Sequence, residues 1–98
     1  MAHAPKFHSI FNIWGVTLFF SPRCDCLTET HAIEFDFGDN WAEAVGQSAY
    51  YGLQTGKKAG IVLILESMKD RKYWIRLNTT IEQFNMPIDT WRMGNSVY

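Results

Sequence analysis

The sequence lacks the features that mark several specialised classes of protein. Its 98 residues contain no repeat, low-complexity segment or linker, and they are enough for one domain but too few for two. The two cysteines, Cys24 and Cys26, lie too close together to be a good disulfide pair, and no histidine stands at zinc-ligand spacing from them. A net charge of -1 gives no bulk attraction for nucleic acid, so a nucleic-acid role would need a local basic patch.

A long hydrophobic run is also missing. The apolar stretch over residues 10–20 is too short to span a bilayer, so we expect no stable membrane insertion. As an export signal it is poor, because Ser21-Pro22-Arg23 is not a small-residue cleavage site. We expect a buried strand here and a cytoplasmic location by default. The alternative is a flexible or signal-like segment over residues 1–15, with export if residues 1–22 act as a signal.

The residues that are present indicate a single α/β domain covering residues 1–98. Hydrophobic residues make up 47% of the chain and aromatic residues 15%, which is enough for a modest core. Strands are predicted over 16–20, 23–27, 31–37 and 60–65, helices over 40–55 and 68–85, and a short edge strand over 88–93. The order β-β-β-α-β-α-β predicts a mixed sheet in which an antiparallel meander leads into a right-handed βαβ crossover, with the helices packed on the sheet.

The clearest strand signal is the alternation over residues 31–37. Its apolar and acidic side chains point to opposite sides of a strand: Ile33, Phe35 and Phe37 against Glu34 and Asp36. Residues 60–65 are apolar without alternation, as expected for a central strand that is covered on both faces.

The helices carry start, stop and packing signals. Asn40 and Glu43 have the form of a capping box at the start of the first helix, and Gly56 is a natural stop at its end. The second helix has an apolar stripe for burial: Trp74, Leu77, Ile81 and Phe84. We interpret His31 as a residue of the turn that precedes the alternating strand.

Three carboxylates are candidates for a cation site: Asp25, Glu34 and Asp36. A hairpin that pairs Asp25 with Glu34 puts all three on one side and leaves residues 28–31 as the turn. In that register the residues facing the core are Cys24, Cys26, Ile33 and Phe35. Three neighbouring acids repel one another unless a cation binds between them. From spacing alone, a solvent-exposed strand face with incidental acids remains the alternative.

One stretch of the chain resembles the core of the PD-(D/E)XK, or restriction-endonuclease-like, nucleases. That family carries an Asp on its second core strand and an acid followed two residues later by Lys on the third. A helix that often bears Gln and Tyr four residues apart comes next. The residues that match in order and in element are Asp25, Glu34, Gln47 and Tyr51. The resemblance covers residues 16–66 and leaves residues 67–98 as a C-terminal helix and edge strand.

The sequence departs from this pattern at one position. The family's lysine, two residues after the acid, is replaced by Asp36. The resemblance implies that this lysine positions or activates the attacking water and stabilises developing charge, so we expect weak or absent nuclease activity without it. Residues 39–55 contain no lysine that could replace it. Lys57 and Lys58 are the nearest candidates, and the alternative is that they are ordinary solvated turn residues.

The resemblance implies a metal-dependent nuclease that acts on phosphodiester bonds of DNA or RNA. The three acids would hold Mg²⁺ or Mn²⁺, which would lower the pKa of a bound water. Gln47 would position that water or the substrate, and Tyr51 would contact the nucleic acid. The six bases between residues 57 and 76 would attract the phosphate backbone.

The alternative function is a catalytically inactive nuclease-fold binding or interaction module, including a homo-oligomeric one. The missing lysine, the small size and the near-neutral charge favour it. Three aromatic residues in the C-terminal part are expected to be exposed and available for an interface: Tyr73, Trp91 and Tyr98.

Overall fold

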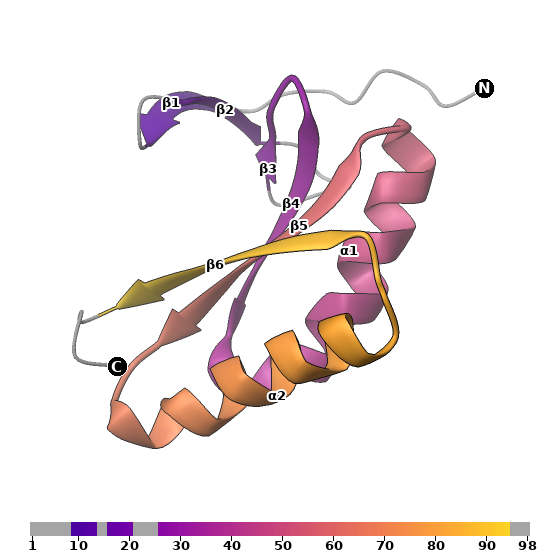
Figure 1. Ribbon diagram of the computed structural model, residues 1–98. Coiled ribbons are helices and arrows are strands. Elements are labelled where there is room, and N and C mark those ends of the chain that lie inside the picture. The colour runs from indigo at the N-terminus through magenta and orange to yellow at the C-terminus, as the bar shows by residue number, and fades with distance from the viewer. Residues whose placement is uncertain (1–8, 14–15, 21–25, 95–98) are drawn as a thin grey trace.

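The computed structural model describes residues 9–13, 16–20 and 26–94. The strands are β1 (Ser9–Ile13), β2 (Val16–Phe20), β3 (Cys26–Leu27), β4 (His31–Phe37), β5 (Lys58–Leu65) and β6 (Ile88–Gly94) (Figure 1). The helices are α1 (Trp41–Thr55) and α2 (Arg71–Gln83), each preceded by a 3-10 turn, η1 (Gly38–Asn40) and η2 (Met68–Asp70). Cys24, Asp25 and Tyr98, which carry predictions made above, lie outside the described residues.

All six of these strands form one mixed sheet in the order β1-β2-β3-β4-β5-β6. The first four are antiparallel neighbours, whereas β5 is parallel to β4 and β6 is parallel to β5. The predicted α/β fold class is confirmed, because a meander leads into a βαβ crossover. Two details go beyond the prediction: the apolar segment 10–20 contributes two strands, and the edge strand β6 is reached by a second crossover through α2.

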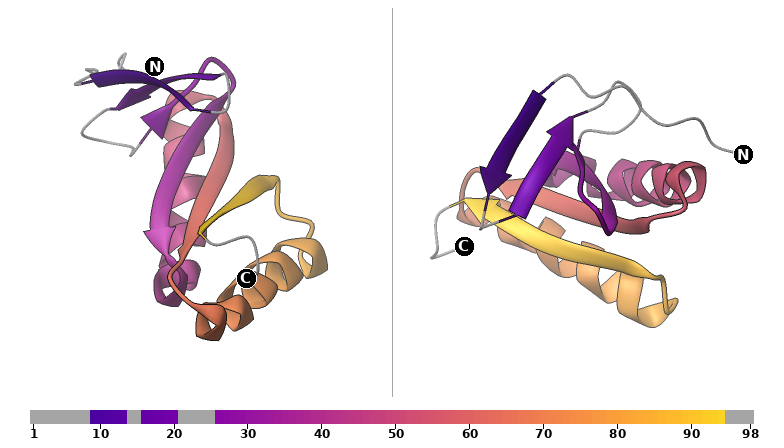
Figure 2. Two further views of the ribbon diagram at one scale, coloured as in Figure 1. Left: turned by 90° about the vertical axis from the view of Figure 1, so that its left-hand side faces the viewer. Right: turned by 90° about the horizontal axis from the view of Figure 1, so that it is seen from above.

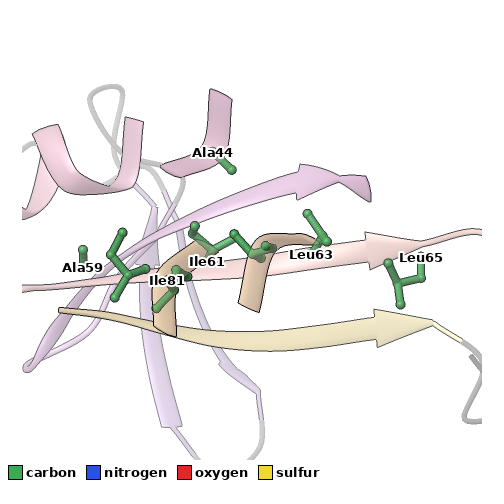
Figure 3. Packing of buried hydrophobic residues seen from close by; sticks show 8 residues of the cluster. Ala44, Ala59, Ile61, Leu63, Leu65 and Ile81 are labelled. Carbon is green, nitrogen blue, oxygen red and sulfur yellow. The ribbon is translucent and has the colours of Figure 1, made fainter. Parts of the chain in front are cut away.

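Both helices cover the same face of the sheet (Figure 2). Right-handed crossovers that add strands in one direction place their helices on one side, which accounts for this two-layer arrangement. The main core lies between the helices and alternate residues of β5 (Figure 3). Its buried members are Ala44, Ala59, Ile61, Leu63, Leu65, Leu77, Ile81 and Ile88.

The other residues of β5 point to the opposite face. Val62 is fully buried there, in a second cluster with Cys26 of β3 and Ile33 of β4. Three half-buried side chains pack against this cluster: Phe35, Trp91 and Met93. β5 is therefore buried on both faces, as its uniform apolar sequence predicted.

Small residues bring α1 close to the sheet. Ala44, Ser48 and Gly52 form its buried side. A Cβ at Gly52 would lie 3.1 Å from the carbonyl oxygen of Lys57, so a side chain there would push the helix away from the start of β5. The helix ends as predicted at Gly56, whose φ of 67° lies in the left-handed region that favours glycine.

Two local predictions at the helix ends are wrong. The capping box does not form: the Asn40 side chain makes no cap hydrogen bond, because η1 leads the chain into α1 and turns the Asn40 amide toward Asp36. Phe84 is 71% exposed instead of buried. The reason is that α2 ends at Gln83 and the chain turns away at Asn85, whose φ is 50°.

Three further residues lie in surroundings that differ from the prediction. Tyr73 and Trp91 are half-buried instead of exposed, because Tyr73 packs on the main core and Trp91 lies over Gly60, where a Cβ would be 2.8 Å from its ring. His31 is the first residue of β4 and not part of the turn. Among the described residues, neither helix has the length and apolar character needed to cross a membrane.

Replacing Leu77 with alanine tests the role of the main core. Leu77 is fully buried, whereas Leu53 on α1 is 80% exposed. We expect Leu77→Ala to lower the free energy of unfolding by about 2–5 kcal/mol, because it leaves a cavity. The same change at Leu53 should cost less than about 0.5 kcal/mol. Urea denaturation followed by tryptophan fluorescence measures both values, and equal losses would show that this packing does not stabilise the fold.

Candidate functional site

Glu34 and Asp36 point to the helix-covered side of the sheet. Glu34 is the register partner of Ile61 and Asp36 that of Leu63, and both partners belong to the main core under the helices. Glu34 is only 6% exposed, and Asp36 is half-buried. The alternative of a solvent-exposed acidic face is therefore wrong for Glu34, because α1 packs on this side of β4. Phe37, on the opposite side, is 48% exposed.

Asp36 lies where β4 passes into η1, close to the start of α2. Asn40 Nδ2 donates to Asp36 Oδ1 at 3.3 Å. The turn packs tightly on α2, because a Cβ at Gly38 would lie 3.1 Å from the Tyr73 ring. Two bases sit over that ring, with their charged groups 5.1 and 5.6 Å from its centre: Lys72 and Arg76. Bases of α2 therefore lie at the same edge of the sheet as Asp36.

The short strand β3 pairs with β4 in the predicted register. The described pairs are Cys26 with Ile33 and Leu27 with Ala32. Cys26 and Ile33 are buried in the same cluster, as predicted. Asp25 lies outside the described residues, so the position of the third acid stays a prediction.

Gln47 and Tyr51 stand one turn apart on α1. Tyr51 packs against Leu27 of β3 and Ala32 of β4. Gln47 is exposed and lies four residues before Tyr51, which corresponds to about 6 Å along the helix axis. The two residues from Ala32 to Glu34 cover about 6.6 Å of strand. Because α1 runs antiparallel to β4, Gln47 is roughly level with Glu34.

Lys57 and Lys58 lie at the opposite end of β4 from Asp36. Lys58 is the register partner of His31, and the five residues from His31 to Asp36 span about 16 Å of strand. Lys57 Nζ donates to the carbonyl oxygen of Thr28, and Lys58 forms an ion pair with a residue of β6. The structure thus places both lysines away from Glu34 and Asp36.

The fit to a metal ion rests on the two acids of β4. Glu34 and Asp36 supply two carboxylates on one side of the strand, and oxygen donors of this kind suit Mg²⁺. Within the described parts of the chain, no group of three His, Cys, Asp or Glu side chains is placed to hold a metal. A site with three carboxylates therefore depends on Asp25.

A hydrogen-bonded cluster joins the N-terminal ends of β4, β5 and β6. His31 Nε2 lies 2.7 Å from Asp89 Oδ2, and Lys58 Nζ lies 3.1 Å from the same oxygen. An ionised carboxylate only accepts hydrogen bonds, so both nitrogens donate. Thr30 Oγ1 lies 2.7 Å from His31 Nδ1, and the Trp91 ring meets the imidazole edge-on with centroids 5.5 Å apart.

Sequence reasoning missed this cluster. His31 and Asp89 are 58 positions apart, and only the parallel pairing of both strands with β5 brings them together. The sole signal was an acid near the start of the last predicted strand. The hydrogen bond from His31 holds the pKa of Asp89 below its ordinary value of 3.8; partial burial opposes this, and the hydrogen bond and charge of Lys58 add to it.

Asp89→Asn tests whether the cluster stabilises the fold. A carboxyl with a lowered folded-state pKa contributes stability that is present above its unfolded value, 3.8, and lost as the pH falls through the folded-state value. At pH 7 we expect the variant to have a lower free energy of unfolding than the parent. The difference should be about 1 kcal/mol or less, because Asp89 is 40% exposed. Below pH 3.8 the free energies of unfolding of the two proteins should converge. Urea titrations across this range, with exposed Asp39→Asn as control, measure it. A constant difference at all pH values would contradict the assignment.

Comparison with known proteins adds no relative to this picture. No family model, no curated protein and no solved structure matches the chain. What the chain does must be inferred from the arrangement of its own residues.

Proposed function

We propose that this chain is a metal-dependent nuclease-like domain that acts weakly on phosphodiester bonds. One observation carries the proposal: Glu34 and Asp36 lie on the same side of β4, beneath α1 and next to the short strand β3. In the PD-(D/E)XK nucleases that the sequence resembles, the same kinds of element in the same order hold the acidic site.

Glu34 and Asp36, with Asp25 as the third carboxylate, would hold Mg²⁺ or Mn²⁺. Divalent cations of this type prefer oxygen ligands, and a cation relieves the repulsion between neighbouring carboxylates. Such an ion polarises a phosphodiester and lowers the pKa of a bound water. Glu34 is only 6% exposed, so packing beneath α1 restricts the position of its carboxylate.

Other residues of the chain would hold the nucleic acid. Gln47 is exposed and level with Glu34, so its amide can orient a water or a phosphate oxygen. Tyr51 packs on β3 and β4 and supports the helix that carries Gln47. Exposed bases of η2 and α2 at the edge near Asp36 would attract the phosphate backbone: Lys69, Arg71, Lys72 and Arg76.

The expected activity is weak because neither candidate lysine, Lys57 or Lys58, lies near the acids. Asp36 stands where the resemblance implies a lysine, and Lys57 and Lys58 are held at the far end of β4. The same observation favours a second candidate function, a catalytically inactive nuclease-fold module that binds nucleic acid or a protein partner.

A cation-binding assay tests the acidic site. Mg²⁺ or Mn²⁺ should raise the midpoint of thermal unfolding, since a ligand that binds only the native state stabilises it by mass action. Glu34→Gln keeps the shape of the side chain and removes its charge, so it should abolish the shift, as should Asp25→Asn. Asp39→Asn changes an exposed acid of η1 and should leave the shift intact. A cation effect that survives Glu34→Gln, or no effect on the parent, would contradict the proposed site.

Asp36→Lys tests the catalytic part of the proposal. A fixed positive charge beside the developing negative charge is often worth about 10²–10³ in rate, so we expect a gain of that order in metal-dependent cleavage of labelled DNA or RNA. Asp39→Lys makes the same charge change three positions away and should give no gain. Brisk cleavage by the parent that Asp36→Lys slows would show that this position has another role. Inactivity of both proteins would leave the inactive module as the better description.

A further inference from the structure

β6 forms one edge of the described sheet (Figure 2). It pairs with β5 on one side, and no described strand pairs with it on the other. A free edge presents a row of backbone N–H and C=O groups that can pair with a further strand. Proline, lysine or a bulge often protects such an edge, but β6 contains no proline or lysine and keeps an unbroken register with β5. The edge is therefore suited to strand pairing.

One flank of α2 lies along the same edge, on the helix-covered side. Thr90 Oγ1 of β6 donates to Asn78 Oδ1 at 2.6 Å, so Asn78 marks the flank of α2 that faces β6. The helical row through Asn78 consists of Arg71, Ile75, Asn78 and Glu82. Ile75 is 54% exposed. Arg71 and Glu82 are exposed, and neither forms an ion pair with another described residue.

This row is complementary to itself. Its spacing, four, three and four residues, is the same when read from either end. A two-fold axis through its centre therefore places Arg71 opposite Glu82 of a second copy, and Ile75 opposite Asn78 of that copy. The axis generates each contact twice, so two pairs of opposite charge flank an apolar centre. This charge pattern favours a second copy of the chain as the partner.

β6 has one favourable register with β6 of a second copy. Opposite residues of antiparallel strands point to the same face, so the two-fold axis passes through a residue position and not between two residues. An axis at Trp91 pairs all seven residues of both strands. An axis at Thr90 would bring Pro87, which has no N–H, into the ladder. An axis at Arg92 would place two like charges opposite each other.

The strand register and the helical row place the axis at the same level. Because α2 connects two parallel strands, it runs antiparallel to β6. The step from Thr90 to Trp91 is about 3.3 Å, which corresponds to about two helical residues back from Asn78. That level is within about one residue of the centre of the row, which lies between Ile75 and Asn78.

The lateral position of α2 also fits a pair of copies. α2 packs on both β5 and β6, so its axis lies roughly midway between these two strands. Strands are about 4.8 Å apart, and pairing of two β6 strands therefore brings the two α2 axes to about 10 Å from each other. Packed helices are commonly about 8–10 Å apart. The strands and the helices can thus make contact in the same arrangement.

We propose that the chain forms a two-fold symmetric homodimer in which the β6 strands pair antiparallel about Trp91 and the α2 flanks meet at Ile75. The two sheets then form one continuous sheet with all the helices on one side. Glu34 and Asp36 lie outside this interface. Lys72 and Arg76 sit over the Tyr73 ring and not in the row that faces β6. The proposal therefore stands independently of the proposed nuclease function.

Sedimentation equilibrium of the full chain over a series of concentrations tests the proposal. We expect a monomer–dimer equilibrium. Arg71→Glu and Glu82→Arg each place like charges opposite each other at two symmetric points, so each should raise the dissociation constant about tenfold. The double variant restores opposite charges and should recover the affinity of the parent. Ile75→Asp should raise the dissociation constant at least as much as the charge reversals, because it puts a carboxylate at the apolar centre.

A matched control and a second measurement separate this interface from other association. Lys72→Glu makes the same charge reversal outside the row, and it should dimerise as the parent does. Hydrogen exchange of β6 amides should slow as the dimer forms, which contact through α2 alone would not cause. Both charge reversals in the row suit the helix macrodipole, so α2 should stay folded by circular dichroism.

Three results would overturn the proposal. The first is a parent protein that stays monomeric at all concentrations, including one that associates only when nucleic acid is added. The second is a dimer in which the double variant is as weak as the single charge reversals, or in which those reversals have no effect. The third is a dimer whose β6 amides exchange as fast as those of the monomer.

Discussion

The parallel pairing of β5 with β4 is the constraint on which the rest of the structure depends. Parallel neighbours need a crossover connection, and a right-handed crossover decides which side of the sheet its helix covers. Here that side carries Glu34 and Asp36. The second parallel pairing, of β6 with β5, places α2 on the same side, and the main core forms between the helices and β5. The acids of β4 are thereby held beneath a helix, while Phe37 remains on the other face.

The sequence predicted best the elements whose pattern has a single physical interpretation. The uniform apolar run of β5, the alternation of β4 and the glycine stop of α1 are all confirmed. Alternation separates the two sides of β4, but it cannot say which side a helix will cover, because that depends on where β5 joins the sheet. Phe84 was misplaced for a related reason: its spacing from Ile81 fits a helical stripe, yet the helix ends one residue before it. A strand of two residues such as β3 carries too little pattern to define its ends.

For the candidate site, the sequence predicted which residues of one strand share a side, but it could not predict the distances between residues of different elements. Glu34 and Asp36 were correctly placed on one side of β4, whereas the separation of Lys57 and Lys58 from Asp36, about 16 Å along the strand, follows from the register of β5. The contact between His31 and Asp89 was hidden for the same reason, since it requires the registers of β4, β5 and β6 together. In a parallel sheet, the two ends of the strands form separate surfaces with different chemistry.

The fold separates basic side chains that lie close together in the sequence. The sequence predicted a cation site at three carboxylates and six bases between residues 57 and 76 that would together attract a phosphate backbone. In the structure the bases divide into two groups. Those of η2 and α2 are exposed at the edge of the sheet where β4 ends, and several exposed bases together suit the repeated charges of a polyanion. Lys57 and Lys58 instead lie at the other end of the strands, where Lys57 Nζ donates to the carbonyl oxygen of Thr28 and Lys58 Nζ pairs with Asp89. A polyanion bound by the proposed function would therefore meet the bases near the start of α2 and not these two lysines, whose ammonium groups are held by Thr28 and Asp89.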